Sequence, residues 1–296
     1  MPVIWAIREM ARRHYDLDVE VLQLKGTAEF EAALPEGACE VIIERLDYTY
    51  GLPLRGRNVT MFCAPLLTSE TELVVAPDIA DPAQLVGKRV ALRQTGRPHA
   101  SILRLRAMGL EGRVQTEIVP DSAVGRWAQW KKVLSGEAAA TFISDLYLEP
   151  ALQAGLKVLP APQVPIVNLY AQGCLTSFAA ANDALMRDYM RANVHALAWL
   201  KLRRGEALEL SRGELMQRMG IADRRQFERW FDAIVSPLQL KPYPTPEAVA
   251  NMYEVACSLF PGCEGLNPLA TWDLHWLKQL DDEGFVDALA QQLATP

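Results

Sequence analysis

Residues 84–110, Gln-Leu-Val-Gly-Lys-Arg-Val-Ala-Leu-Arg-Gln-Thr-Gly-Arg-Pro-His-Ala-Ser-Ile-Leu-Arg-Leu-Arg-Ala-Met-Gly-Leu, contain the repeating unit of an α/β fold. Residues 88–93 alternate apolar and polar side chains, which predicts a short strand. The spacing of apolar side chains over residues 102–108 predicts a helix. A polar loop joins the two, at the carboxyl end of a strand, where open α/β sheets bind ligands.

The chemistry of this loop favours an anion. Backbone N–H groups at the start of a helix attract negative charge, and Arg93 and Arg97 strengthen that preference. We therefore predict that Thr95, Gly96, Arg97 and His99 contact an acidic small molecule. The alternative is a solvated turn of an ordinary strand–turn–helix unit.

Composition limits the classes of protein that the chain can belong to. Its 296 residues, 50% of them hydrophobic, suffice for one large domain or two lobes. A net charge of −6 predicts neither a nucleic acid nor an anionic membrane as partner. No apolar run reaches the ~20 residues needed to cross a bilayer, so no membrane insertion is expected. The first residues do not resemble a signal peptide, which predicts a cytoplasmic protein for the chain as written.

The five cysteines, Cys39, Cys63, Cys174, Cys257 and Cys263, are expected to be buried free thiols. Cys257 and Cys263 flank Ser-Leu-Phe-Pro-Gly and could form a disulfide in an oxidising compartment, although spacing alone does not establish the geometry. No Cys or His pair has the spacing of a structural zinc site. We predict no metal and no cofactor.

The first two thirds of the chain alternate predicted strands with predicted helices. An amphipathic helix is predicted over residues 2–14, followed by a strand at 19–24, a helix at 27–34 and further strands at 39–43 and 59–64. This order is typical of a parallel sheet. A second α/β unit follows, with strands predicted at 72–77, 88–93, 115–119, 138–143 and 157–159 and helices at 102–108, 121–134 and 145–154.

The last third is predicted to be a helical layer that packs on the sheet of the first lobe. A proline-rich segment, residues 160–165, reads as a crossover, and a strand is predicted at 167–175. Helices are then expected over residues 185–202, 213–219, 225–234, 246–259 and 271–293.

Several short motifs now occur in a recognisable order: Gly-Ala-Cys-Glu-Val-Ile-Ile, Leu-Val-Gly-Lys-Arg-Val-Ala, Ala-Met-Gly-Leu, Val-Leu-Ser-Gly-Glu-Ala-Ala-Ala and Leu-Glu-Pro-Ala-Leu-Gln-Ala-Gly. This order resembles the type 2 periplasmic-binding-protein superfamily, in its nitrate/sulfonate/taurine branch with the related thiamine-pyrimidine-synthesis proteins. The resemblance covers roughly residues 15–205. One departure is Ala138-Ala-Ala, where the family has an acidic residue. The other is at the start, where the family has a strand before the first helix.

The resemblance implies an α/β fold with two lobes, a helical C-terminal layer and an apparently missing first strand. Lobe one would comprise residues 1–79 and 171–296, and lobe two residues 80–170. A small organic anion would bind in the cleft between the lobes, with Tyr48, Arg126, Asp145 and Tyr147 joining the loop residues named above. The chain would then be the substrate-binding protein of an ABC-type uptake system, with a membrane permease as partner. If the N-terminus is truncated, the compartment would be the periplasm.

Each of these residues also has an ordinary structural explanation. Tyr48 could cover a sheet edge, Asp145 could cap a helix, and His99 could cap a helix or face solvent. An enzyme on the same fold, acting on a small aromatic acid, is the alternative function, and a sensing domain is a third. A decarboxylase would need a cation such as Arg97 to hold the carboxylate, and His99 or Glu44 to protonate the ring carbon.

Overall fold

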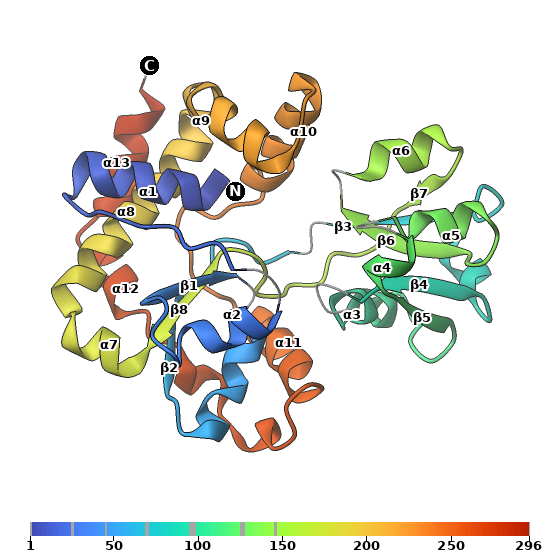
Figure 1. Ribbon diagram of the computed structural model, residues 1–296, viewed down its shortest axis with the longest axis horizontal. Helices are drawn as coiled ribbons and strands as arrows, with labels where there is room; N and C mark the ends of the chain where they lie inside the picture. The colour runs from blue at the N-terminus through green and yellow to red at the C-terminus, as the bar shows by residue number, and fades with distance from the viewer. Residues whose placement is uncertain are drawn as a thin grey trace. The chain divides into compact units, whose positions relative to one another are not determined.

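The computed structural model describes residues 2–24, 27–44, 46–68, 71–94, 99–124, 128–144 and 147–295. The chain divides into two compact units. Unit 1 contains residues 1–67 and 165–296, and unit 2 contains residues 68–164. The chain therefore leaves unit 1 after residue 67 and returns to it at residue 165, once unit 2 is complete (Figure 1).

Unit 1 is built on a three-stranded sheet of order β1-β8-β2. The strands are β1 (Val41–Glu44), β2 (Val59–Cys63) and β8 (Ala171–Leu175). Both β1 and β2 pair antiparallel with β8, so that Glu44 lies opposite Ala171 and Cys63 opposite Gln172. The central strand of this sheet thus comes from the segment that follows unit 2, and the sheet can close only after unit 2 has been traversed.

Helices make up the rest of unit 1, and Figure 1 shows α1, α8, α9, α10 and α13 grouped together. The central helix is α8 (Asp183–Leu202), which packs against α1 (Pro2–His14), where Trp5 and Trp199 stack with ring centroids 5.7 Å apart. The ring of Phe62 on β2 contacts Tyr189 of α8 and Trp276 of α12. The helical layer therefore covers the sheet, as predicted. The other helices are α2 (Thr27–Ala33), α7 (Thr176–Ala181), α9 (Arg204–Met219), α10 (Arg224–Val235), α11 (Pro246–Cys257), α12 (His275–Asp282) and α13 (Phe285–Ala294).

Several single turns of 3-10 helix complete unit 1. The turn η1 (Asp47–Gly51), which contains the predicted ligand contact Tyr48, begins three residues after the end of β1 and packs on α11. The others are η2 (Pro53–Arg55), η5 (Cys263–Gly265) and η6 (Pro268–Thr271).

Unit 2 is a five-stranded mixed sheet of order β5-β4-β6-β3-β7. Its strands are β3 (Thr71–Val75), β4 (Arg89–Arg93), β5 (Gln115–Val119), β6 (Ala140–Ser144) and β7 (Lys157–Leu159). The strands β4, β5 and β6 are parallel, whereas β3 pairs antiparallel with β6 and β7. The parallel trio gives unit 2 one edge at which three strands end.

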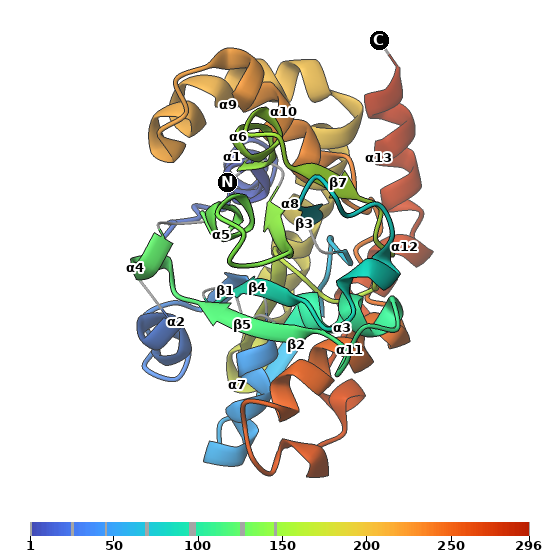
Figure 2. The same ribbon diagram turned by 90° about the vertical axis from the view of Figure 1, so that its right-hand side faces the viewer.

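Helices cover both faces of this sheet because the strands are apolar on both sides, as buried α/β strands are. Leu73, Val90 and Phe142 pack with Leu105 of α3 (His99–Ala107) on one face. Val74 and Ile143 pack on the other face with α5 (Trp130–Leu134) and α6 (Leu148–Gln153). Figure 2 shows the same helices and strands from the side. The short elements η3 (Pro82–Leu85) and α4 (Asp121–Val124) complete the unit.

The sequence-based prediction of a parallel sheet in the first lobe is wrong. Residues 19–24 form no strand, and the two strands that do form there are held by the antiparallel β8. Alternation of apolar side chains over six residues also fits an extended segment that lies on a surface, and residues 17–24 do so with alternating partial exposure.

Two predicted helices are interrupted. In the segment 121–134 the described residues form separate helices α4 and α5, and in the segment 271–293 η6 is followed by α12 and α13. The second break falls at Gly284, whose φ of 72° is left-handed and ends α12. Conversely, α9 begins at Arg204, well before the predicted start at residue 213.

Candidate functional site

The carboxyl ends of three parallel strands meet at one edge of unit 2. Arg93 of β4 lies beside Val119 of β5 in register, and the Gln94 N–H donates a hydrogen bond of 3.0 Å to the Val119 carbonyl oxygen. The strand β6 runs parallel on the other side of β4 and ends at Ser144. We call this edge, defined by Arg93, Val119 and Ser144, the carboxyl edge of unit 2.

Most of the predicted ligand contacts belong to segments that follow these strand ends. Thr95, Gly96, Arg97, Arg126 and Asp145 lie outside the described residues. His99 is the first residue of α3, and its side chain is not described. Tyr147 is partly exposed and precedes α6 directly. Gln94, which precedes Thr95, and Ser144, which precedes Asp145, are described, and the topology places both at the carboxyl edge of unit 2.

The start of α3 supplies the electrostatics of this edge. The helix has nine residues, begins six positions after the end of β4 and carries no acidic side chain in its first turn. The unsatisfied N–H groups of its first turn leave partial positive charge there. Between Arg93 and Pro98 the sequence holds two arginines and no carboxylate. Such an arrangement can bind a carboxylate, sulfonate or phosphate group.

Unit 1 has a comparable edge, where β1 and β2 end beside the start of β8. Glu44, the second candidate acid, is the last residue of β1 and is partly exposed. Tyr48 follows in η1 and is buried, with its ring edge-on to Phe30 at a centroid distance of 5.2 Å. Asp47 beside it is also buried. The chain here turns tightly, with the Thr49 hydroxyl donating to the Leu46 carbonyl oxygen at 2.5 Å.

Tyr170 was not singled out from the sequence. It immediately precedes β8, is fully buried, and has a φ of 68° in the left-handed region. A bulky side chain in this conformation is a true outlier, with a strain of ~1–3 kcal/mol, and such residues cluster at functional sites. Nothing in the letters Asn-Leu-Tyr-Ala signals it, because a positive φ is expected from Gly or Asn rather than from Tyr.

Two features are absent from the described ranges. No group of three or more His, Cys, Asp or Glu side chains in those ranges could hold a metal ion. Among the helices of the described part of the chain, none combines the length and apolar character that a bilayer crossing requires.

No protein-family model matches the sequence, and no curated protein is similar to it in sequence. Solved structures are similar. A putative periplasmic sulfonate-binding protein SsuA from Methylobacillus flagellatus KT superposes with a TM-score of 0.67 at 18% identity, covering 96% of this chain and 89% of that one. The periplasmic aliphatic sulphonate binding protein SsuA from Escherichia coli gives a TM-score of 0.64 at 18% identity, covering 86% and 81%.

An enzyme has a similar structure as well. A mutant of the desulfurization enzyme DSZB in complex with biphenyl-2-sulfinic acid gives a TM-score of 0.62 at 12% identity, covering 96% of this chain and 97% of that one. At these identities the likeness concerns the fold. The chain has the α/β fold of these periplasmic sulfonate-binding proteins, built from two units.

Proposed function

We propose that this chain is the substrate-binding protein of an ABC-type uptake system for a small organic anion. The observation that carries the proposal is the carboxyl edge of unit 2, where three parallel strands end and α3 begins, on a fold shared with sulfonate-binding proteins. A membrane permease would be its partner, as the import systems named for similar structures suggest.

The class of ligand follows from the charge of this edge. The first turn of α3 has no carboxylate to neutralise its positive end, and the sequence between β4 and α3 contains a further arginine, Arg97. An arginine binds the planar or tetrahedral oxygens of an acid group through two parallel hydrogen bonds. Ligand selectivity beyond the acid group would come from side chains such as Tyr48, Arg126, Asp145 and Tyr147.

Calorimetric titration and thermal unfolding with alkanesulfonates and aromatic carboxylates test this proposal. A bound compound at a hundred times its dissociation constant should stabilise the protein by ~2.7 kcal/mol. Arg97→Ala should weaken binding tenfold or more, since charge-assisted hydrogen bonds contribute ~1.5–3 kcal/mol.

Arg113→Ala is the matched control for this titration. Arg113 precedes β5, at the opposite ends of the same parallel strands, where its side chain donates to the Gly109 carbonyl oxygen. Affinity in this variant should equal that of the parent. Equal affinity of Arg97→Ala and the parent would refute the anion site, and the failure of both compound classes to bind would refute the proposed function.

A second candidate function is an enzyme acting on a small aromatic acid. The similarity to DSZB, a desulfurization enzyme, favours it, because the same fold there binds an aromatic sulfinic acid. In this chain Arg97 would hold the acid group and His99 or Glu44 would supply the proton that replaces it. Decarboxylation is one such reaction.

Mass spectrometry of each binding mixture after incubation separates the two functions. A compound recovered unchanged from a saturated protein supports a binding protein. A product of altered mass supports an enzyme, and turnover that survives both His99→Ala and Glu44→Ala would exclude these two side chains as the proton donor.

A further inference from the structure

Two of the five cysteines lie close together in the sequence of unit 1, outside the candidate site described above. Cys257 is the last residue of α11 and Cys263 the first of η5. Tyr253 and Cys257 lie one turn apart on the same face of α11, and the Tyr253 hydroxyl donates to the Cys263 carbonyl oxygen, which brings Cys263 to the face that carries Cys257. Between them, Gly262 adopts a left-handed φ of 91°, and the Cys263 N–H donates to the Phe260 carbonyl oxygen at 3.0 Å. We call residues 257–263 the thiol loop.

The two thiols differ in access. Cys257 is partly exposed, whereas Cys263 is fully buried. Burial, followed by the effect of the neighbouring Cys257 side chain, raises the pKa of the Cys263 thiol to about 12. Cys257 is therefore the side chain that a reagent in solution can reach first, and Cys263 is the neighbour that can react with it afterwards.

The thiol loop is packed against η1, the turn that carries Tyr48. A Cβ placed on Gly51 would lie 2.8 Å from the ring of Phe260, so this contact exists only because residue 51 is glycine. Tyr253 adds a second link: its hydroxyl lies 2.5 Å from the Cys263 carbonyl oxygen, and its ring meets Tyr50 at a centroid distance of 5.3 Å. The conformation of the loop and that of η1 are thus coupled through Phe260 and Tyr253.

We propose that Cys257 and Cys263 are an oxidisable dithiol whose disulfide fixes the thiol loop and thereby orders η1. The oxidant is a low-molecular-weight disulfide. The Cys257 thiolate attacks one sulfur of that disulfide and releases one thiol, which leaves a mixed disulfide on Cys257. The Cys263 thiol then loses its proton and attacks Sγ of Cys257, and the second small thiol leaves. One protein disulfide and two small thiols are the products.

The other cysteines lack these features. Cys63 and Cys174 are buried on neighbouring strands but are not opposite each other, because Cys63 pairs with Gln172 and Cys174 with Thr60. Cys39 is partly exposed and lies far along the chain, near β1, which makes it the control for nonspecific oxidation.

The chemistry is tested on the reduced full-length chain treated with glutathione disulfide, followed by alkylation of the remaining thiols and peptide mapping. A 257–263 cross-link should form in the parent and in Cys39→Ser. Cys263→Ser should instead accumulate glutathione on Cys257, and Cys257→Ser should gain no modification within the loop. A cross-link that forms only after denaturation in urea would overturn the proposal.

The coupling to η1 is tested by hydrogen exchange. Oxidation should slow exchange at the amides of Thr49 and Leu52, which donate to Leu46 and Thr49, and should raise the thermal midpoint by about 5 °C. In Phe260→Leu the disulfide should still form, but the protection of η1 should be smaller. Unchanged exchange at η1 in the cross-linked parent would overturn the coupling, and equal protection in Phe260→Leu would overturn the role of the ring.

Discussion

His195 is a buried histidine whose surroundings hold it neutral. It lies on α8 with only 9% of its surface exposed, and its Nδ1 is 3.2 Å from the Tyr15 hydroxyl. The ring of His14 is 4.4 Å away between centroids. Burial, and then the repulsion of His14, lower the pKa of His195 to about 4, while burial raises the pKa of Tyr15 to about 12 and keeps it a hydrogen-bond donor.

We predict an acid-dependent loss of stability from this residue. Between pH ~6.5, the ordinary histidine pKa, and the lowered folded value, the unfolded chain binds a proton that the folded chain does not. As the pH is lowered from ~6.5 to the folded pKa, the free energy of unfolding should therefore fall by roughly 2–3 kcal/mol, and at lower pH this contribution should level off. Urea unfolding of the parent and of His195→Gln at several pH values measures this fall in the free energy of unfolding. The contribution of residue 195 to the fall should be absent in the variant.

His275→Gln is the control because its effect has the opposite sign. Burial alone would lower the pKa of His275, but hydrogen bonds to Asp273 and Asp183 outweigh it and raise the pKa. Protonated His275 stabilises the fold below the unfolded pKa, and this contribution is lost as the pH rises through the folded value. The variant should therefore lose stability in acid. A pH profile of His195→Gln identical to that of the parent would contradict the assignment.

Arg104 is the largest fully buried polar side chain, with 1% of its surface exposed. It extends from α3 and donates to the carbonyl oxygens of Thr71, Ala161 and Pro162, and its guanidinium lies 4.9 Å from the centre of the Phe142 ring. Burial lowers its pKa. Thr71 and Pro162 lie close to the two points at which the chain enters and leaves unit 2. Arg104 therefore fixes both ends of unit 2 to α3.

Arg104→Met should lower the free energy of unfolding by about 3 kcal/mol, because three carbonyl groups lose their buried donors. Arg106→Met is a matched substitution two residues along the same helix. Its side chain is 46% exposed and pairs with Glu111 at the surface, so a change within about 0.5 kcal/mol is expected. Denaturant titration compares the two, and equal losses would contradict the role given to Arg104.

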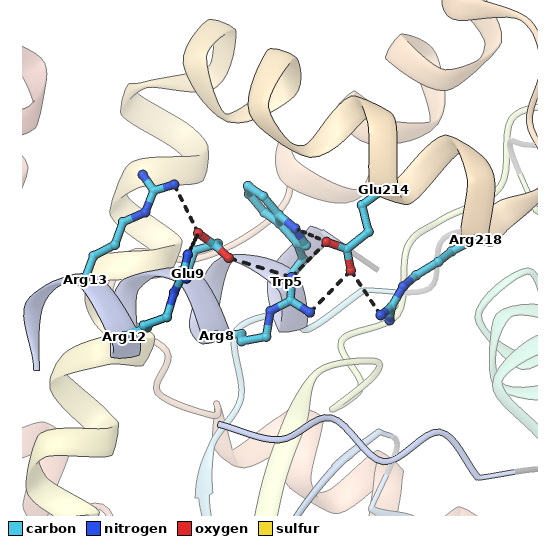
Figure 3. Close-up of polar contacts among 7 residues, drawn as sticks. All are labelled: Trp5, Arg8, Glu9, Arg12, Arg13, Glu214 and Arg218. Atoms are coloured by element: carbon cyan, nitrogen blue, oxygen red, sulfur yellow. Dashed lines mark hydrogen bonds and ion pairs between the residues drawn. The ribbon is translucent and has the colours of Figure 1, made fainter. Parts of the chain in front are cut away.

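At the scale of elements, a charged cluster joins α1 to α9 (Figure 3). Glu214 of α9 accepts hydrogen bonds from Trp5 at 3.0 Å and from Arg8 at 2.8 Å and pairs with Arg218 at 3.0 Å. Next to it, Glu9 pairs with Arg8, Arg12 and Arg13. The hydrogen bond from Arg8 is the main reason that the pKa of Glu214 is lowered. Four arginines share two carboxylates, so the cluster has an excess of positive charge.

Removing the central carboxylate should be costly. Glu214→Gln should destabilise the protein by ~1–2 kcal/mol, since Arg8 and Arg218 would lose their common partner. Glu209→Gln on the same helix is the control, because the Glu209 side chain is 61% exposed. The difference between the two variants should shrink in high salt, and unfolding in urea with and without salt measures it. A Glu209→Gln loss as large as that of Glu214→Gln would refute the argument.

The elements show what a sequence can and cannot specify. The amphipathic α1 and the strands β5 and β7 occur where the pattern of apolar side chains predicts them, since their core contacts are set by local periodicity. Residues 19–24 have the pattern of a strand but no partner strand. A strand forms only where another strand offers its hydrogen-bonding groups. The local pattern of apolar side chains does not show whether such a partner strand lies nearby.

The candidate site was only partly accessible from sequence for a related reason. The loop after β4 could be proposed as an anion site from its position and its arginines, because the chemistry that attracts an anion lies in residue types. Tyr170 could not, because its importance rests on a backbone angle that tertiary contacts impose. The antiparallel β8 between β1 and β2 likewise depends on pairing across more than a hundred residues.

At the scale of the whole molecule, the two units differ in how they can fold. Unit 2 is one continuous segment with all five strands of its sheet and its own cores on both faces. Unit 1 is discontinuous: β1 and β2 are joined through β8, which the chain reaches after unit 2. Within the described part of residues 1–67, these two strands have no strand to pair with.

We therefore predict that residues 68–164, expressed alone, fold and unfold cooperatively, whereas residues 1–67 do not. At the usual ~0.7 kcal/mol per residue, the unfolding enthalpy of the isolated unit 2 near 60 °C should be roughly 65 kcal/mol. Scanning calorimetry and circular dichroism of both fragments measure this. Arg104→Met should lower the midpoint of the fragment as it does that of the whole chain, because all its partners lie within unit 2. A fragment 68–164 with no cooperative transition would show that unit 2 depends on unit 1, and its strands could then no longer be treated as an independent scaffold for the anion site.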